Sequence, residues 1–217
     1  MREKCLIFTG DSITDCDRLW DDRPEQLGFG YVRMIYEYLL KKSGAEPAAE
    51  EGFGVVPGLR IYNRGHDGFT AFQMKHRWEE DCLSLEPDLV TILVGINDLY
   101  MHIGGAGGYG AEGYGIHLEE MIDQAKGRTG AKLILMEPFV FPKPLEYAAW
   151  EEPLSEFREE MRRLAGKYGM GFVPLWDMFR EAQKRYAADT LTTDGIHLTE
   201  KGHRLLAAAW LKTYEEL

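Results

Sequence analysis

The residues best suited to chemistry are a serine near the start of the sequence and an aspartate–histidine pair near its end. Ser12 lies in the run Gly10-Asp11-Ser12-Ile13, and Asp194 precedes His197 by three residues. At this spacing the carboxylate can accept from one ring nitrogen and leave the other nitrogen free as a base. A histidine held in this way can activate a serine hydroxyl as a nucleophile. Ser12, His197 and Asp194 are therefore candidates for nucleophile, base and orienting acid.

Two other segments carry hydrogen-bond donors without charge. In Asn63-Arg64-Gly65-His66, the glycine can expose its backbone N–H to a ligand because no side chain obstructs it. In Gly95-Ile96-Asn97-Asp98, the amide of Asn97 is a neutral donor. Together with the triad candidates, Gly65 and Asn97 complete the set of groups that acyl transfer requires.

Each segment also has a simpler interpretation. Ser12 could be only a helix N-cap, with Asp15 completing a capping box. The segments around Gly65 and Asn97 could be turns, and Asp194 could pair with His197 for structural reasons only.

Two other classes of function also stay open. Asp11, Asp15, Asp194 and His197 could bind a divalent metal for phosphoryl chemistry, which would leave Gly65 and Asn97 without a role. The chain could also be a sugar-binding module that has lost catalysis.

The elements that must position these residues alternate between strands and helices. Nearly continuous apolar runs predict five buried parallel strands: Cys5–Phe8, Leu59–Tyr62, Leu89–Val94, Lys132–Met136 and Gly171–Pro174. Helical spacing of apolar residues predicts helices around 32–40, 72–82, 118–125, 154–168 and 205–210. Pro153 suits the first turn of the fourth helix, and Thr199 is a candidate N-cap for the last. This alternation predicts an α/β fold with a doubly wound, mostly parallel sheet in a single domain over residues 1–217, with ligands at the carboxyl ends of the strands.

The four segments closely resemble the SGNH hydrolases, also called the GDSL family. All four occur here in the family's order: Gly10-Asp11-Ser12-Ile13, Asn63-x-Gly65, Gly95-x-Asn97-Asp98 and Asp194-x-x-His197. The resemblance implies a flavodoxin-like fold, a serine esterase or lipase-like acylhydrolase activity, and no cofactor or metal. It also implies an oxyanion hole formed by the Ser12 N–H, the Gly65 N–H and the Asn97 amide.

Within that family, the sequence is most similar to the intracellular acetylxylan esterases, which deacetylate xylo-oligosaccharides. The similar segments are Gly28-Phe29-Gly30-Tyr31-Val32, Arg77-Trp78-Glu79-Glu80-Asp81 and the Asn97 segment followed by Tyr100. Trp20 and Tyr100 are candidates to stack on sugar rings, although ordinary packing explains them equally well. A lysophospholipase or a thioesterase of the same fold is the alternative, but no long apolar lid for a lipid is evident.

The composition of the chain argues against several classes of binding partner. The formal net charge of −11 argues against nucleic acid and anionic membrane as partners. No apolar run approaches a membrane span or a signal peptide, which favours a cytoplasmic enzyme. The three cysteines, Cys5, Cys16 and Cys82, form neither a disulfide framework nor a zinc pattern. The resemblance suggests a homo-oligomer.

Several segments carry weaker expectations. We expect residues 41–58, a polar stretch, to form an exposed loop. Residues 104–115 contain seven glycines and predict either a surface loop or a mobile flap beside the active site, or an oligomer contact. Of the other histidines, His66 and His102 are the candidates to line the active site.

Overall fold

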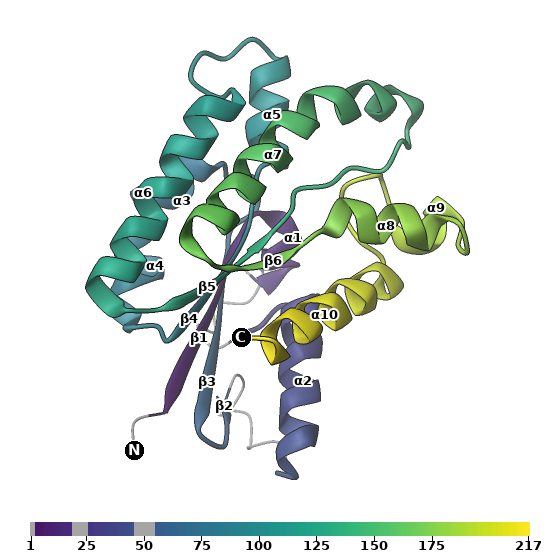
Figure 1. Ribbon diagram of the computed structural model, residues 1–217. Helices are drawn as coiled ribbons and strands as arrows, with labels where there is room; N and C mark the ends of the chain where they lie inside the picture. Colours follow the sequence, from purple (N-terminus) through teal and green to yellow (C-terminus); the bar gives the residue numbers. More distant parts are fainter. Residues whose placement is uncertain (1–2, 19–25, 46–54) are drawn as a thin grey trace.

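The computed structural model describes residues 3–18, 26–45 and 55–217, and its central feature is a six-stranded sheet (Figure 1). The strands are β1 (Lys4–Gly10), β2 (Val55–Val56), β3 (Leu59–Gly65), β4 (Leu89–Leu93), β5 (Lys132–Met136) and β6 (Gly171–Val173). The helices are α1 (Ser12–Asp15), α2 (Tyr31–Ser43), α3 (Ala71–His76), α4 (Trp78–Asp81), α5 (Ile96–Ile103), α6 (Ala111–Thr129), α7 (Glu151–Tyr168), α8 (Leu175–Gln183), α9 (Ala188–Leu191) and α10 (Glu200–Glu215), with 3-10 turns η3 (Leu83–Leu85) and η4 (Leu145–Trp150).

The sheet confirms the predicted α/β class and adds one strand. The spatial order is β2-β3-β1-β4-β5-β6, and every pair is parallel except β2 with β3. The prediction of five strands was wrong because β2 has only two residues and lies inside the segment assigned to a loop. Without that edge strand, the order is that of a flavodoxin-like doubly wound sheet.

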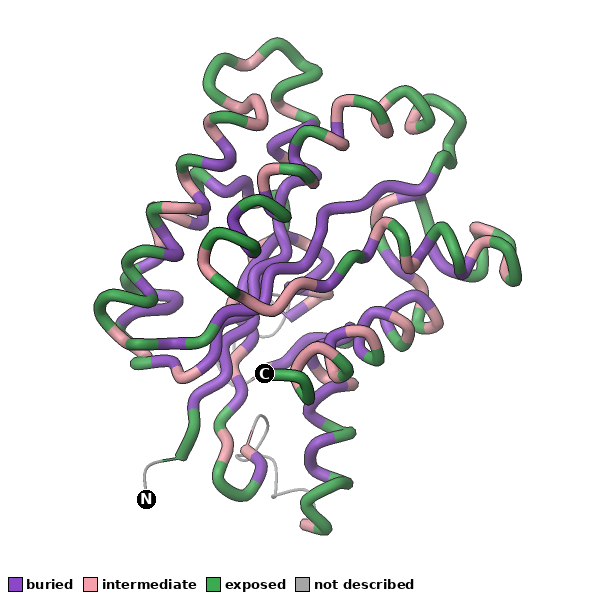
Figure 2. Tube along the Cα trace, in the orientation of Figure 1, coloured by how far each residue is buried: buried purple, intermediate pink, exposed green. Residues whose placement is uncertain are grey.

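Alternating side chains of the strands give the sheet two hydrophobic faces. In β1, Leu6 and Phe8 belong to one buried cluster and Cys5 and Ile7 to the other. Helices α2, α8 and α10 cover the first face, and α3, α4, α5, α6 and α7 cover the second (Figures 1 and 2). Burial on both faces explains why the parallel strands are continuous apolar runs.

Two of the predicted helix-start signals act as expected. Thr199 caps α10 by accepting from the Gly202 N–H at 3.2 Å, and Pro153 lies in the first turn of α7, both as predicted. The single helix expected over residues 72–82 is instead two short helices separated at Arg77. The misleading residue was Phe72, which is 41% exposed and does not belong to the buried stripe.

The glycine-rich segment is partly helical. Gly113 and Gly115 lie inside α6, so the connecting loop is shorter than the predicted segment of residues 104–115. A Cβ at Gly115 would lie 2.8 Å from Glu160 Oε2, so the glycine lets α6 approach α7 closely. The prediction of an exposed loop over residues 41–58 also fails at its ends, because α2 continues to Ser43 and β2 occupies Val55–Val56.

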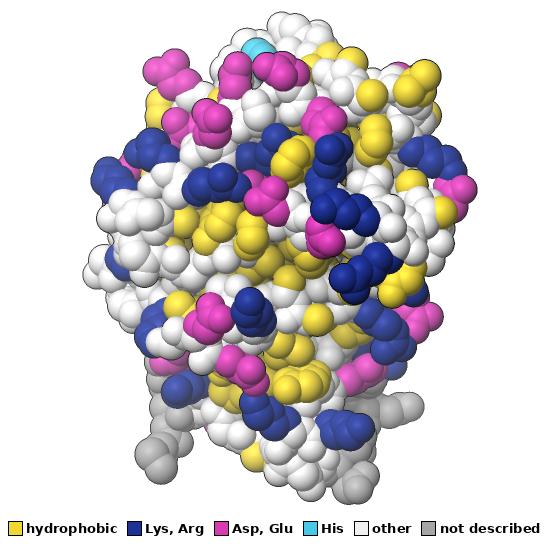
Figure 3. Space-filling view, turned by 45° about the vertical axis from the view of Figure 1, so that its right-hand side comes forward, with side chains coloured by type: hydrophobic (Ala, Val, Ile, Leu, Met, Phe, Trp, Pro, Cys, Tyr) yellow, Lys and Arg dark blue, Asp and Glu magenta, His cyan; other side chains and the backbone are white. Residues whose placement is uncertain are grey.

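Charged side chains of both signs mix on the molecular surface. On the face that Figure 3 shows, Lys and Arg lie among Asp and Glu, with hydrophobic side chains between them. The net charge of −11 therefore does not form one continuous negative field there. Within the described ranges, no helix combines the length and the apolar character needed to span a membrane.

Candidate active site

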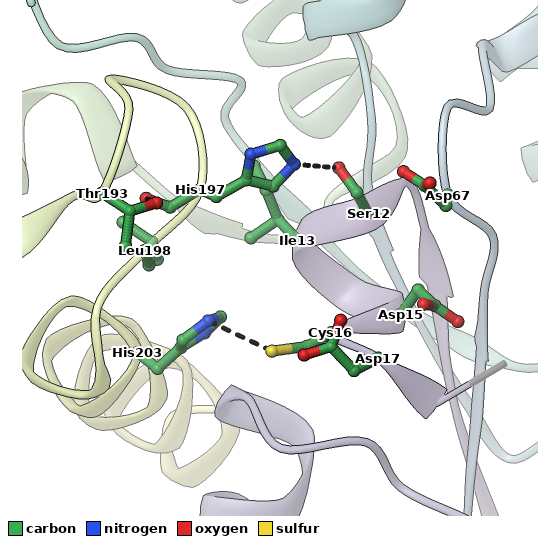
Figure 4. Close-up of a pocket in the computed structure, with 10 residues that line it drawn as sticks. All are labelled: Ser12, Ile13, Asp15, Cys16, Asp17, Asp67, Thr193, His197, Leu198 and His203. Carbon is green, nitrogen blue, oxygen red and sulfur yellow. Dashed lines mark hydrogen bonds between the residues drawn. The ribbon is translucent and has the colours of Figure 1, made fainter. Parts of the chain in front are cut away.

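Three predicted catalytic residues form one hydrogen-bonded chain. Ser12 Oγ lies 2.9 Å from His197 Nε2 (Figure 4). On the other side of the ring, His197 Nδ1 lies 2.6 Å from Asp194 Oδ2. Burial alone would raise the pKa of Asp194, but hydrogen bonds from the His197 ring and two backbone N–H groups outweigh it and hold that pKa below its ordinary value. The ionised carboxylate accepts from Nδ1–H, so a neutral His197 presents Nε2 to the serine as an acceptor.

The loop before α10 holds the acid and the imidazole in place. Asp194 Oδ1 accepts from the backbone N–H groups of Ile196 at 2.9 Å and His197 at 2.8 Å. Gly195 has φ +99°, and its carbonyl accepts from the Phe141 N–H at 2.8 Å. A side chain at this position would be strained and would also collide with the Lys143 carbonyl. The loop is therefore fixed to the segment after β5.

Ser12 is positioned by the sharp exit of the chain from β1. A Cβ at Gly10 would collide with the Leu93 carbonyl of β4, so this strand end requires the smallest residue. The N-cap of α1 is Asp11, whose Oδ1 accepts from the Ile13 N–H at 3.0 Å, so the interpretation of Ser12 as the cap was wrong. Ser12 is the first helical residue, and among the described residues its N–H has no hydrogen-bond partner.

Asp11 is a buried acid immediately before the serine. Burial raises its pKa to about 7, although the Ile13 N–H and the charge of nearby His197 oppose the rise. The neighbouring carboxylate of Asp67 adds to the rise. No pattern in the sequence indicates this shift, because it arises from the packing of α1 against the sheet.

Gly65 ends β3 beside α1, and its N–H is already engaged. It donates to Asn63 Oδ1 at 2.9 Å, while Arg18 Nη2 donates to the Gly65 carbonyl at 2.6 Å. A Cβ at Gly65 would collide with the backbone of Asp15, so the close approach of β3 and α1 requires glycine. Any oxyanion that uses this N–H must share it with Asn63.

Asn97 lies in the first turn of α5, which follows β4. Its Nδ2 donates to the Phe69 carbonyl at 3.0 Å, and the amide carries a second N–H. Its neighbour Asp98 accepts from the Ala71 N–H with both oxygens at 3.1 Å, which joins α5 to the start of α3. Burial raises the pKa of Asp98 to about 7 despite this bond.

A pocket of about 390 Å³ opens beside the serine (Figure 4). It is lined by Ser12, Ile13, Asp15, Cys16, Asp17, Asp67, Thr193, His197, Leu198 and His203. Three of these side chains are carboxylic acids, and no lysine or arginine is among them. The pocket therefore suits neutral or cationic groups better than anions.

The pocket contains a cysteine–histidine pair that sequence reasoning missed. Cys16 Sγ lies 3.4 Å from His203 Nε2 (Figure 4). The Tyr31 N–H donates to His203 Nδ1 at 3.2 Å. Because Nδ1 accepts, a neutral His203 carries its proton on Nε2 and donates it toward the sulfur. Burial lowers the pKa of His203 to about 4 and raises that of Cys16 to about 11, so this histidine cannot act as a base toward the thiol.

Of the other residues predicted for the site, none that the structure describes lies among those that line the pocket beside Ser12. Trp20 lies outside the described residues. Tyr100 lies on α5, is 61% exposed, and its ring centroid is 6.0 Å from that of Trp150. His66 bonds to Asp81 at 2.8 Å, and His102 packs near Phe157. Neither histidine is among the residues that line the pocket beside Ser12.

The acids considered for a metal are engaged separately. Asp11 caps α1, Asp15 lies 3.6 Å from Arg18 Nε, and Asp194 holds His197. Across the three described ranges, no group of three or more His, Cys, Asp or Glu side chains is arranged to hold a metal ion. This geometry offers Ser12 and His197 for chemistry rather than a ring of carboxylates.

Sequence comparison finds matches over nearly the whole chain. Residues 8–205 match the GDSL-like lipase/acylhydrolase family. An acetylxylan esterase of Geobacillus stearothermophilus is 30% identical over 225 residues, which cover 95% of this chain and 92% of that enzyme.

Solved structures show the same fold. A Parabacteroides merdae protein described as GDSL-like and lipase-related superimposes with a TM-score of 0.83 at 30% identity, covering 98% of this chain and 95% of that one. A catalytic variant of the Geobacillus acetylxylan esterase superimposes with a TM-score of 0.79 at 27% identity, covering 98% and 94%.

Proposed function

The chain belongs to the GDSL-like lipase/acylhydrolase family as an esterase, and we propose that it removes short acyl groups, specifically O-acetyl groups, from a carbohydrate such as a xylo-oligosaccharide. Ser12 is the proposed nucleophile, His197 the base and Asp194 the acid that orients it. The observation that carries this proposal is the continuous hydrogen-bonded chain from Asp194 through His197 to Ser12 at the mouth of a pocket.

The geometry suits a two-step acyl transfer. His197 Nε2 takes the Ser12 proton while Oγ bonds to the ester carbonyl carbon, and the carbonyl electron pair moves onto oxygen. When this intermediate collapses, the bond to the leaving alcohol breaks and His197 returns its proton to the alcohol oxygen. Water then attacks the acyl-enzyme with the same base, which releases the carboxylic acid and restores Ser12. Asp194 stabilises the cationic imidazole in both steps.

The three proposed oxyanion donors differ in whether they have an N–H group available for a ligand. The N–H of Ser12 is free among the described residues, and Asn97 has one amide hydrogen beyond its bond to Phe69. The Gly65 N–H is occupied by Asn63, so its part in the oxyanion hole requires a shared hydrogen bond. Ser12 and Asn97 are therefore the stronger donors in our proposal.

Two observations support an acetylated sugar as the substrate. The similar Geobacillus enzyme is an acetylxylan esterase. The solved catalytic variants of that enzyme replace a serine, an aspartate and a histidine, and the last two have the same spacing as Asp194 and His197, which supports the proposed triad. The second observation on the substrate comes from the pocket. The acidic lining of the pocket disfavours the phosphate groups of lysophospholipids and coenzyme A thioesters.

A panel of esters tests the proposal. The purified protein should release acetate from acetylated xylo-oligosaccharides and hydrolyse p-nitrophenyl acetate faster than p-nitrophenyl octanoate. The Ser12→Ala protein, which we expect to keep the fold, serves as the control for uncatalysed hydrolysis. A preference for the octanoate, or equal rates with Ser12→Ala, would overturn the proposed function.

A further inference from the structure

Three aromatic side chains pack next to one another, and one of them touches the loop that carries Asp194 and His197. The ring centroids of Tyr147 and Trp150 are 4.4 Å apart, and those of Trp150 and Tyr100 are 6.0 Å apart. Tyr147 and Trp150 belong to η4, and Tyr100 belongs to α5. We call Tyr147, Trp150 and Tyr100 the aromatic row.

One end of the row touches the loop that carries the catalytic acid and base. A Cβ placed on Gly195 would lie 2.8 Å from Tyr147 Cδ2, so the tyrosine ring packs directly against this glycine between Asp194 and His197. The negative charge of Asp194 also contributes to a raised pKa of Tyr147, after the larger effect of burial. Tyr147 is therefore a close neighbour of the triad.

The other end of the row shares a helix with the proposed oxyanion donor. Tyr100 follows Asn97 by three residues in α5, and residues at this spacing lie one above the other on one face of a helix. Trp150, at the start of α7, connects the two ends. The row therefore extends from the helix of Asn97 to the loop of His197.

Two members of the aromatic row are partly buried, and the third is exposed. Tyr147 and Trp150 are partly buried and pack against the hydrophobic cluster that includes side chains of α6 and α7. Tyr100 is 61% exposed, and successive rings tilt by 42° and 45°. None of the three lines the acidic pocket on which Ser12 and His197 also open. The triad thus has two distinct neighbouring surfaces: the pocket lined by three carboxylic acids, and the aromatic row, in which Tyr100 is exposed.

We infer that the aromatic row binds the sugar ring of the leaving alcohol. A pyranose has flat C–H faces bordered by hydroxyl groups, and Tyr and Trp offer flat apolar faces with polar edges. An open surface leaves the hydroxyls of an oligosaccharide in water, whereas a long acyl chain is stabilised by enclosure. The row is next to His197, which must return a proton to the alcohol oxygen.

This inference rests on the proposed esterase function, and the experiment separates the two. For each protein, kcat/KM is measured on acetylated xylotriose and on vinyl acetate, a small ester without a ring, and their ratio is compared. Trp150→Ala and Tyr100→Ala should each lower the ratio about tenfold, the factor that 1.4 kcal/mol of lost binding produces. Trp150→Phe, which keeps a ring, should restore most of the ratio.

Tyr38→Ala is the matched control, because Tyr38 is a 44% exposed tyrosine on α2 and belongs to neither surface. It should leave both rates unchanged. A ratio that Trp150→Ala and Tyr100→Ala do not change would overturn the inference, as would equal losses on the two esters.

A binding measurement decides the inference independently of turnover. In the Ser12→Ala background, calorimetric titration with acetylated xylotriose should show a dissociation constant that Trp150→Ala raises about tenfold. Failure of the parent to bind, or binding that ignores Trp150→Ala, would overturn the aromatic row as a sugar site. Failure of the wild type to hydrolyse vinyl acetate would instead contradict the esterase proposal.

Discussion

In the part of the chain that the structure describes, two histidine–aspartate pairs have similar geometry, and only one of them has a nucleophile beside it. In the first pair His197 Nδ1 is 2.6 Å from Asp194, and in the second His66 Nε2 is 2.8 Å from Asp81. The side chains of the first pair are about half exposed, at 48% and 50%, whereas those of the second are 14% and 10% exposed.

The surroundings of the pairs give them different chemistry. His197 offers its second nitrogen to Ser12, so a proton can move from serine to imidazole. The ring of His66 stacks on Phe69 at 4.4 Å, and Asp81 also binds Arg77 at 3.0 Å. Arg77 and His66 share one carboxylate, and that arrangement ties α3 and α4 to the end of β3. The short histidine–carboxylate distance therefore does not identify a base; a free nitrogen that faces a nucleophile does.

The two pairs should differ most when each histidine is replaced by glutamine. His197→Gln should lower kcat for p-nitrophenyl acetate by roughly 10⁴-fold or more, because the serine loses its base. His66→Gln should leave kcat close to that of the wild type. Steady-state kinetics on both proteins, with circular dichroism as the check on folding, measures the difference. A comparable loss of kcat in a folded His66→Gln protein would contradict our division of the two pairs.

Replacing the two aspartates should also separate the pairs. Asp194→Asn should lower kcat by about 10⁴-fold, because an amide no longer holds Nδ1–H or stabilises the imidazolium. Asp81→Asn is the matched change in the second pair and should leave kcat near that of the wild type. The same ester assay decides between them. Full activity in Asp194→Asn would remove this residue from the triad.

A smaller effect is expected at the proposed oxyanion donor. Asn97→Ala should lower kcat by roughly 10²–10³-fold with little change in KM, because its second amide hydrogen would bind charge that develops only in the transition state. Gln73→Ala is the control, because this exposed amide serves the capping box of α3 and is absent from the pocket lining beside Ser12. If Asn97→Ala raises KM alone, the residue binds substrate and does not stabilise the oxyanion.

The contrast between the pairs also explains what the sequence could predict. Asp194 and His197 are three residues apart, so one loop sets their geometry and the spacing alone suggests it. His66 and Asp81 are fifteen positions apart, and Cys16 and His203 are joined only when α10 packs beside α1. Contacts of this kind depend on tertiary packing, which no local pattern encodes. The Asn63-x-Gly65 spacing could have indicated the turn in which Asn63 occupies the Gly65 N–H.

Burial likewise determines which strands could be predicted from the sequence. Strands β1, β4 and β5 are buried on both faces, so their apolar runs predicted them well. Strand β2 needs only two residues, because it pairs antiparallel with Arg60 and Leu59 at the sheet edge. An edge contact this short leaves no period in the sequence. Tyr147 and Trp150 were missed because their relation to Tyr100 depends on α5 and α7 packing together.

The last prediction concerns stability. Here we expect the His66–Asp81 pair to contribute more than the Asp194–His197 pair. At pH 7, Asp81→Asn should lower the free energy of unfolding by about 1–3 kcal/mol, because the partly buried Arg77 and His66 lose a charged partner. Burial alone would raise the pKa of Asp81, but hydrogen bonds from His66 and Arg77 outweigh it and hold the pKa below 3.8. A depressed folded-state pKa stabilises above the ordinary carboxyl pKa, and this contribution is lost as the pH falls through the folded value.

Urea unfolding of the wild type and Asp81→Asn should therefore show a difference that is constant from pH 7 to about 5 and narrows below about pH 4. Asp194→Asn should change stability far less, since both partners of that pair are half exposed and solvent screens them. A difference for Asp81→Asn that persists unchanged to pH 3 would assign its effect to packing rather than charge. An equal loss of stability in Asp194→Asn would show that the Asp194–His197 pair also stabilises the fold. The proposed functional division between the pairs would then rest on Ser12 alone.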